Sequence, residues 1–140
     1  YKYPRPMVTV DAVVFAKDSG NMKVLLIKRG NDPYKDHWAF PGGFVEMDET
    51  LEEAVARELK EETGMDGIEL KQLKAFSAVD RDPRGRTISV GFTGLASKQQ
   101  MKVEGADDAA DAKWFDPDSL PNLAFDHDHI LRTAVESLEL

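Results

Sequence analysis

The strongest structural signal in this chain is the stretch Gly43-Phe-Val-Glu-Met-Asp-Glu49-Thr50-Leu-Glu-Glu-Ala-Val-Ala-Arg57-Glu58-Leu-Lys-Glu61-Glu62-Thr-Gly64-Met65. Its central part is rich in Leu, Ala, Glu, Lys and Arg, which favour helices. Thr50 and Glu53 have the spacing of a capping box, and Gly64 is placed to end the helix. The sequence therefore predicts a helix over Thr50–Thr63.

Three acidic residues gather near the end of this helix. Glu58, Glu61 and Glu62 stand at i, i+3 and i+4, so their carboxylates share one face, beside an apolar stripe of Val55 and Leu59. Like charges at this spacing repel by roughly 0.2–0.5 kcal/mol per pair, and the helix dipole adds about 0.3–1 kcal/mol for each carboxylate. A solvated acidic face would carry this cost, whereas a bound divalent cation would reverse its sign.

The same stretch resembles the Nudix box at every defined position of that motif. The matching residues are Gly43, Glu49, Arg57, Glu58, Leu59, Glu61, Glu62, Gly64 and Met65. Flanking segments resemble the sub-group that contains ADP-ribose pyrophosphatases and the regulatory domain of a related transcriptional repressor. These segments are Pro6–Asp11, Leu26–Gly30, Trp38–Gly43 and Ala124–His127.

The resemblance implies an α/β (α+β) fold, the Nudix α/β/α sandwich around a mixed β-sheet, with residues 1–140 as a single domain. It implies that Glu49 and Arg57 pair and brace the preceding loop against the helix. It also implies a bound Mg²⁺ or Mn²⁺. The ligands carried over for this cation are Glu58, Glu61, Glu62 and the carbonyl of Gly42.

The implied activity is hydrolysis of a nucleoside diphosphate linked to another group, with ADP-ribose cut to AMP and ribose 5-phosphate as the first choice. The residues expected to act in catalysis are Glu61, Glu58, Arg57 and Glu49. The proton acceptor for the attacking water stays open among Glu58, Glu61, Glu104, Asp107 and Asp108. The residues expected to bind the small-molecule nucleotide are Arg29, Arg81, Arg86, Phe40 and Gly43, with Arg84, Phe125 and His127 as further candidates.

Outside this stretch, the sequence predicts a mixed or largely antiparallel sheet and a second main helix from about Asp126 to the end. A turn at residues 18–21 favours a hairpin between the first two strands. The order of elements does not indicate a repeating βαβ fold. The expected strands are Thr9–Phe15, Val24–Ile27, Leu70–Val79, Arg86–Leu95 and Lys113–Asp116, with a loop over Gly30–His37 and a turn over 80–85.

Composition narrows the class of partners. The 140 residues carry a formal net charge of −8, so a protein that grips nucleic-acid backbones is not expected. There is no cysteine, which excludes disulfides and thiolate metal sites, and no apolar run approaches the ~18 residues of a membrane span. We therefore expect a cytoplasmic protein without nucleic-acid or membrane partners, and the resemblance allows a homodimer.

Three other functions stay open. A nucleoside triphosphate such as 8-oxo-dGTP is an alternative substrate, because ADP-ribose pyrophosphatases often carry a proline nearer to the box than Pro83. A non-catalytic, ADP-ribose-sensing Nudix domain is another alternative. The intact box, and the expectation that no DNA-binding segment follows the final helix, favour the enzyme. A scaffold domain is the third, and a turnover assay would separate it from the others.

Overall fold

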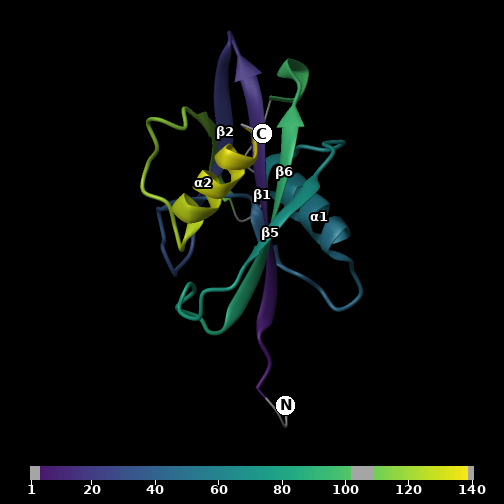
Figure 1. The fold of residues 1–140 in the computed structure, drawn as a ribbon, viewed down its shortest axis with the longest axis vertical. Helices are drawn as coiled ribbons and strands as arrows, with labels where there is room; N and C mark the ends of the chain where they lie inside the picture. Colours follow the sequence, from purple (N-terminus) through teal and green to yellow (C-terminus); the bar gives the residue numbers. More distant parts are fainter. Residues whose placement is uncertain (1–3, 102–108, 139–140) are drawn as a thin grey trace.

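The computed structural model describes residues 4–101 and 109–138. These residues form one seven-stranded sheet with a long helix on each side, which is the expected α/β/α sandwich (Figure 1). The elements in chain order are β1 (Met7–Asp18), β2 (Asn21–Arg29), β3 (Trp38–Ala39), β4 (Gly42–Phe44), α1 (Leu51–Thr63), β5 (Lys71–Phe76), β6 (Thr87–Ala96), the 3-10 helix η1 (Lys98–Met101), β7 (Ala109–Phe115) and α2 (His127–Leu138).

The sheet is mixed, as the sequence predicted. Its strand order is β3-β2-β1-β6-β5, with β4 also paired to β1 and β7 paired to β2. β1 and β6 run parallel from the pair Met7–Thr87 to the pair Ala16–Ala96, and the other described pairs are antiparallel. The predicted hairpin between β1 and β2 is confirmed, with Asp18 opposite Asn21.

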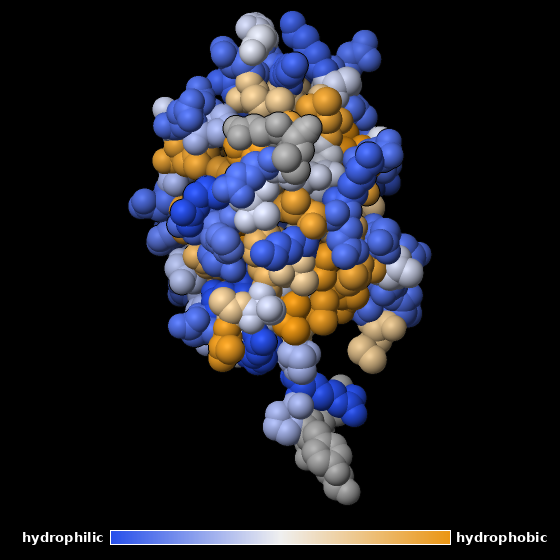
Figure 2. Space-filling model, viewed as in Figure 1, coloured by the Kyte–Doolittle hydropathy of each residue, from blue (hydrophilic) through white to orange (hydrophobic). Residues whose placement is uncertain are grey.

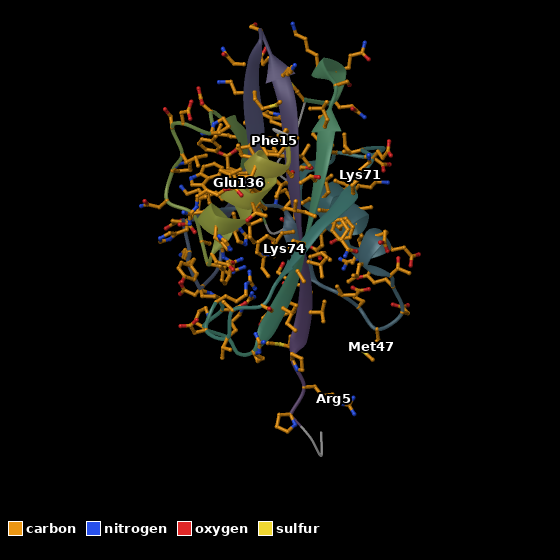
Figure 3. The ribbon with its side chains drawn as sticks, viewed as in Figure 1. Arg5, Phe15, Met47, Lys71, Lys74 and Glu136 are labelled. Atoms are coloured by element: carbon orange, nitrogen blue, oxygen red, sulfur yellow. The ribbon has the colours of Figure 1, made fainter. Side chains whose placement is uncertain are left out.

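The central strand β1 is buried on both faces, which explains its nearly continuous apolar sequence. Alternate residues Val10, Ala12 and Val14 belong to the core that includes α1. Val13 and Phe15 belong to the core that includes α2, and Phe15 is marked in Figure 3. The two helices therefore cover opposite faces of the sheet, and β1 is the strand that both cores share.

The boundaries of several strands differ from the prediction. β3 and β4 were not predicted as strands, because two or three residues beside Pro41 are too few to show alternation. β7 starts at Ala109, before the predicted start at Lys113. The small residues before Lys113 show no alternation from which a strand could be predicted. β5 ends at Phe76, and Val79, which was predicted to lie in this strand, is 74% exposed.

The face drawn in Figure 2 is largely hydrophilic, with separate hydrophobic patches between the hydrophilic side chains. The loop between β4 and α1 projects from the body, and Met47 in this loop is 98% exposed (Figure 3). In the part of the chain that the structure describes, no helix has the length and apolar character needed to cross a membrane.

Candidate active site

The helix α1 is positioned by its caps and by its apolar stripe. Thr50 and Glu53 form the predicted capping box, and Gly64 ends the helix with a φ of 75°, in the left-handed region that favours glycine. Val55 and Leu59 are buried in the core with β1. This packing brings the acidic side of the last two turns towards β4.

A cleft of about 440 Å³ opens beside the end of α1, within the size range of small-molecule sites. It is bordered by α1, β1, β4 and the segments that precede β6 and α2. Its acidic side contains Asp11, Glu58 and Glu62, and Gly42 and Gly43 form the adjoining backbone. The other lining residues that bear on function are Arg29, Phe40, Phe44, Arg57, Arg81, Asp82, Arg84, Phe125 and His127.

Glu62 is an acidic side chain almost removed from water, with 9% of the residue exposed. The backbone N–H of Gly42 donates to Oε1 across 3.4 Å, and Oε2 has no hydrogen-bond partner. Burial, followed by the neighbouring carboxylate of Glu58, raises the pKa of Glu62 to about 10. When Glu58 and Glu62 are both ionised, Oε2 of Glu62 has no hydrogen-bond donor. When Glu62 is protonated, it can donate a hydrogen bond to Glu58. A buried carboxylate oxygen without a partner is costly, so its presence in a cleft needs a reason.

Arg57 joins three carboxylates. Its Nε and Nη2 donate to the two oxygens of Glu49 across 2.9 and 2.6 Å, in a bidentate pair. Its Nη1 donates to Glu58 across 2.7 Å and to Glu61 across 3.2 Å. The hydrogen bond from Arg57 is the main reason why the pKa of Glu49 falls to about 2. The expected pairing of Glu49 with Arg57 is therefore present, and it ties the loop before α1 to the helix.

The two glycines of β4 allow close approaches that a side chain would block. A Cβ on Gly43 would lie 2.7 Å from the carboxyl carbon of Glu58. A Cβ on Gly42 would lie 2.1 Å from the carbonyl oxygen of Val10 in the neighbouring strand. Gly43 therefore leaves room for the Glu58 carboxylate, while Gly42 allows β4 to pair closely with β1.

The three glutamates of α1 are not equivalent. Glu58 and Glu62 line the cleft, whereas the Glu61 side chain is 50% exposed, contacts Arg57 and lies outside the lining. Among the described residues, no group of three or more acidic or histidine side chains stands in an arrangement that could hold a metal ion. The sequence placed all three glutamates on one face, but the differing burial of their side chains depends on β4 and Arg57.

The arginines expected to bind substrate occupy three different settings. Arg81 lines the cleft, but its side chain is 3% exposed and donates to both oxygens of Asp126 across 2.9 and 2.6 Å. Arg86 does not line the cleft and donates to the carbonyl of Ser77 across 2.8 Å. Only Arg29 of these three lines the cleft without a carboxylate partner among the described residues.

Phe40 is fixed by a buried polar network. Its ring is stacked on His127 with centroids 5.1 Å apart, and its backbone N–H donates to Nδ1 of His127 across 3.1 Å. Nε2 of His127 lies 3.5 Å from Asp11, whose other oxygen accepts a hydrogen bond from the Ser89 hydroxyl. Burial holds the pKa of His127 below its ordinary value. Sequence reasoning missed Asp11, although a lone acid inside the apolar strand β1 was a usable signal.

Three candidates for the proton acceptor, Glu104, Asp107 and Asp108, lie outside the described residues. Among the described candidates, Glu58 borders the cleft and Glu61 does not. The choice of proton acceptor therefore stays a prediction.

Comparison with known proteins agrees with this geometry. The model of the NUDIX domain family matches residues 5–134. The chain is 48% identical over 130 residues to the ADP-ribose pyrophosphatase of Methanocaldococcus jannaschii, covering 93% of this chain and 73% of that protein. It is 36% identical over 142 residues to the ADPR responsive transcriptional repressor NtrR of Acinetobacter baylyi, covering 97% of this chain and 56% of the repressor.

Two solved structures are similar over nearly the whole chain. The NUDIX domain of Shewanella oneidensis NrtR, complexed with ADP ribose, is 34% identical with a TM-score of 0.91, and the match covers 98% of this chain and 91% of that one. A bifunctional NMN adenylyltransferase/ADP ribose pyrophosphatase from Francisella tularensis, complexed with AMP and a Mn ion, is 35% identical with a TM-score of 0.84, covering 98% and 43%. Sequence, fold and cleft lead to one conclusion: the chain belongs to the NUDIX domain family and is a Nudix hydrolase.

Proposed function

We propose that this chain, acting as one domain, hydrolyses ADP-ribose to AMP and ribose 5-phosphate with the help of Mg²⁺ or Mn²⁺. The observation that carries the proposal is the pair of neighbouring carboxylates, Glu58 and Glu62, on the wall of the cleft. The identity of the substrate is supported by the 48% identity to an archaeal ADP-ribose pyrophosphatase.

A divalent cation fits the residues that are present. Glu62 offers a buried carboxylate oxygen without a partner, and Glu58 borders the same cleft. Hard cations such as Mg²⁺ prefer carboxylate and carbonyl oxygens. Such a cation, when bound, activates water and offsets charge on the phosphoryl oxygens. The residues proposed to hold it are Glu58, Glu62 and the carbonyl of Gly42. Glu61, the third glutamate expected as a ligand, contacts Arg57 outside the cleft lining and would have to turn towards the cleft to join them.

The chain's own residues would orient the reacting groups. Arg57 holds Glu58 in place and is itself anchored by Glu49. Glu58 is the described carboxylate best placed to accept a proton from the attacking water, with Glu61 as the other candidate. The water oxygen would bond to one phosphorus, and the bridging P–O bond would break so that the second phosphate leaves with the bridging oxygen.

Substrate contacts are proposed for the residues that face the cleft. Arg29 presents a half-buried guanidinium to the phosphates, and Gly43 offers an open backbone beside Glu58. Phe40 is 2% exposed, so it would contribute the rigid wall of the site and not a mobile stacking surface. Arg81 would act indirectly through its buried pair with Asp126.

The direct test is product analysis. The purified chain is incubated with ADP-ribose and Mg²⁺ or Mn²⁺ in ¹⁸O-labelled water, and the products are separated and weighed by mass spectrometry. We expect AMP and ribose 5-phosphate in equal amounts, with the label in one of them and not in both. A product yield no higher than that of a chelator-treated control would contradict the proposal.

The second candidate function is sensing of ADP-ribose without turnover. It is favoured by the similarity to NtrR and to Shewanella oneidensis NrtR, a protein that has also been solved with a 27mer DNA. The expectation that this chain has no nucleic-acid partner therefore stays a prediction. Tight binding of ADP-ribose without turnover in the presence of Mg²⁺ and Mn²⁺ would favour this candidate.

A further inference from the structure

One wall of the cleft is built from alternating aromatic rings and guanidinium groups. The guanidinium carbon of Arg84 lies 4.8 Å from the ring centre of Phe44 and 5.1 Å from that of Phe125. The guanidinium carbon of Arg29 lies 5.0 Å from the centre of the same Phe125 ring. These distances are within the range of cation–π contacts. Phe125 is thus the ring on which both arginines rest.

Arg29 is the arginine of this wall whose charge no described carboxylate neutralises. Its Nε donates to the Pro33 carbonyl across 2.7 Å, and it forms no ion pair with any described carboxylate. Burial, followed by the positive charge of Arg84, lowers its pKa. By contrast, Arg57 and Arg81 are each held by a bidentate carboxylate. A half-buried cation beside a second cation is stabilised when an anion enters the cleft.

Arg84 is held in place by the buried carboxylate of Asp82. Asp82, which is 5% exposed, accepts hydrogen bonds from its Nε across 3.1 Å and from its Nη2 across 2.8 Å. Nη1 has no partner among the described residues, and the side chain is 34% exposed. The carboxylate and the two rings therefore fix the plane of the guanidinium, while one donor group stays available to a ligand.

The backbone at Phe125 is in a conformation that bulky residues seldom adopt. Its φ is 52°, in the left-handed region, where such residues are uncommon and often belong to functional sites. The ring is also packed against Tyr34, with centroids 4.9 Å apart, and against His127 at 5.5 Å. These contacts hold the ring at the cleft and fix the spacing of the two arginines.

We infer that Arg84 and Phe125 complete, together with Arg29, a subsite for the phosphate groups of the substrate. The inference rests on the proposed function for the class of ligand, a nucleoside diphosphate derivative. Arg29 and Arg84 bind phosphate oxygens, and Phe125 is a positioning residue that holds both guanidiniums. The slot between Phe44 and Phe125 is filled by Arg84, so this wall recognises an anion and not a stacked base.

The test measures binding without turnover. Equilibrium dissociation constants for ADP-ribose and for adenosine are measured by calorimetry in excess chelator, so that no divalent cation links protein and phosphate. The parent chain should bind ADP-ribose at least about tenfold more tightly than adenosine, because charged hydrogen bonds to phosphate are lost in adenosine. Arg84→Gln should remove most of this preference while leaving the affinity for adenosine within about twofold.

Three variants separate charge, shape and fold. Arg84→Lys keeps the charge but loses the planar stack, so it should recover only part of the preference. Phe125→Leu keeps an apolar side chain of similar bulk and should reduce the preference although no charge is removed. Arg132→Gln is the matched control, since this exposed arginine of α2 lies outside the cleft and should leave the preference unchanged.

Two results would overturn the inference. One is a parent chain that binds ADP-ribose no more tightly than adenosine. The other is a preference that Arg84→Gln and Phe125→Leu leave intact while their melting temperatures match that of the parent. A preference that these variants abolish, in a chain that hydrolyses no ADP-ribose, would refute the proposed function and leave the subsite standing.

Discussion

Glu62→Gln separates two effects of the buried Glu62, namely the change of stability with pH and the proposed binding of a cation. Glutamine has the shape of a protonated glutamate, so it can accept from the Gly42 N–H and donate to Glu58. The pKa of Glu62 is raised on folding, so without a cation the native protein holds a proton that the unfolded chain releases above about pH 4.5. The parent therefore loses stability as pH rises from about 4.5 towards 10, and the variant escapes this loss.

The magnitude follows from the exchange of one proton. Stability changes by at most about 1.4 kcal/mol per pH unit, so the parent should lose up to about 3 kcal/mol relative to the variant between pH 6 and 8. Urea unfolding in excess chelator at a series of pH values measures this difference directly. Glu52→Gln is a suitable control, because this residue lies in the first turn of the same helix and is exposed.

Mg²⁺ should reverse the order of the two proteins. The parent gains stability because the cation binds the ionised carboxylate, whereas the variant has lost that charge. We expect kcat/KM for ADP-ribose to fall at least about a hundredfold in the variant, which corresponds to about 2.7 kcal/mol. Parallel stability–pH curves for parent and variant would refute the reasoning about burial. Activity within a few-fold of the parent would refute the role of Glu62 as a ligand.

Three further predictions concern the same region. Mg²⁺ or Mn²⁺ should raise the melting temperature far more than sodium at matched ionic strength, and equal shifts would indicate general screening. Gly43→Ala should lower kcat/KM by at least about tenfold with little loss of stability, because its Cβ displaces only the end of the Glu58 side chain. In Gly42→Ala the new Cβ meets the backbone of Val10. This variant should therefore lose about 1–3 kcal/mol or more of unfolding free energy, measured with urea. Because burial lowers the pKa of His127, the unfolded chain binds the extra proton and the fold loses stability as pH falls below 6.5. His127→Gln should flatten that fall, and an unchanged profile would show that the loss arises elsewhere.

Much of the fold could be predicted because the signals are local. The capping box of α1, the turn between β1 and β2 and the apolar stripe with Val55 and Leu59 each depend on neighbouring residues. β3 and β4 could not be predicted in this way. Their few residues are held as strands by pairing with β2 and β1, and that pairing depends on the tertiary arrangement.

The sequence could name the charged residues of the candidate site, but it could not give their contacts. The spacing placed Glu58, Glu61 and Glu62 on one face, but it could not tell that Glu62 is buried and Glu61 half exposed. The partners of the arginines were also beyond the sequence. Arg81 meets Asp126 across forty-five positions of the chain, and such pairs are set by how the segments pack.

The comparison of substrates tests the central claim most directly. The claim is that the cleft recognises a diphosphate with a sugar at each end, so kcat/KM for ADP-ribose and for 8-oxo-dGTP should be measured with saturating Mg²⁺. We expect ADP-ribose to be favoured at least about tenfold, or about 1.4 kcal/mol of transition-state binding, because a triphosphate lacks the terminal ribose. A preference for 8-oxo-dGTP with release of pyrophosphate would contradict the claim.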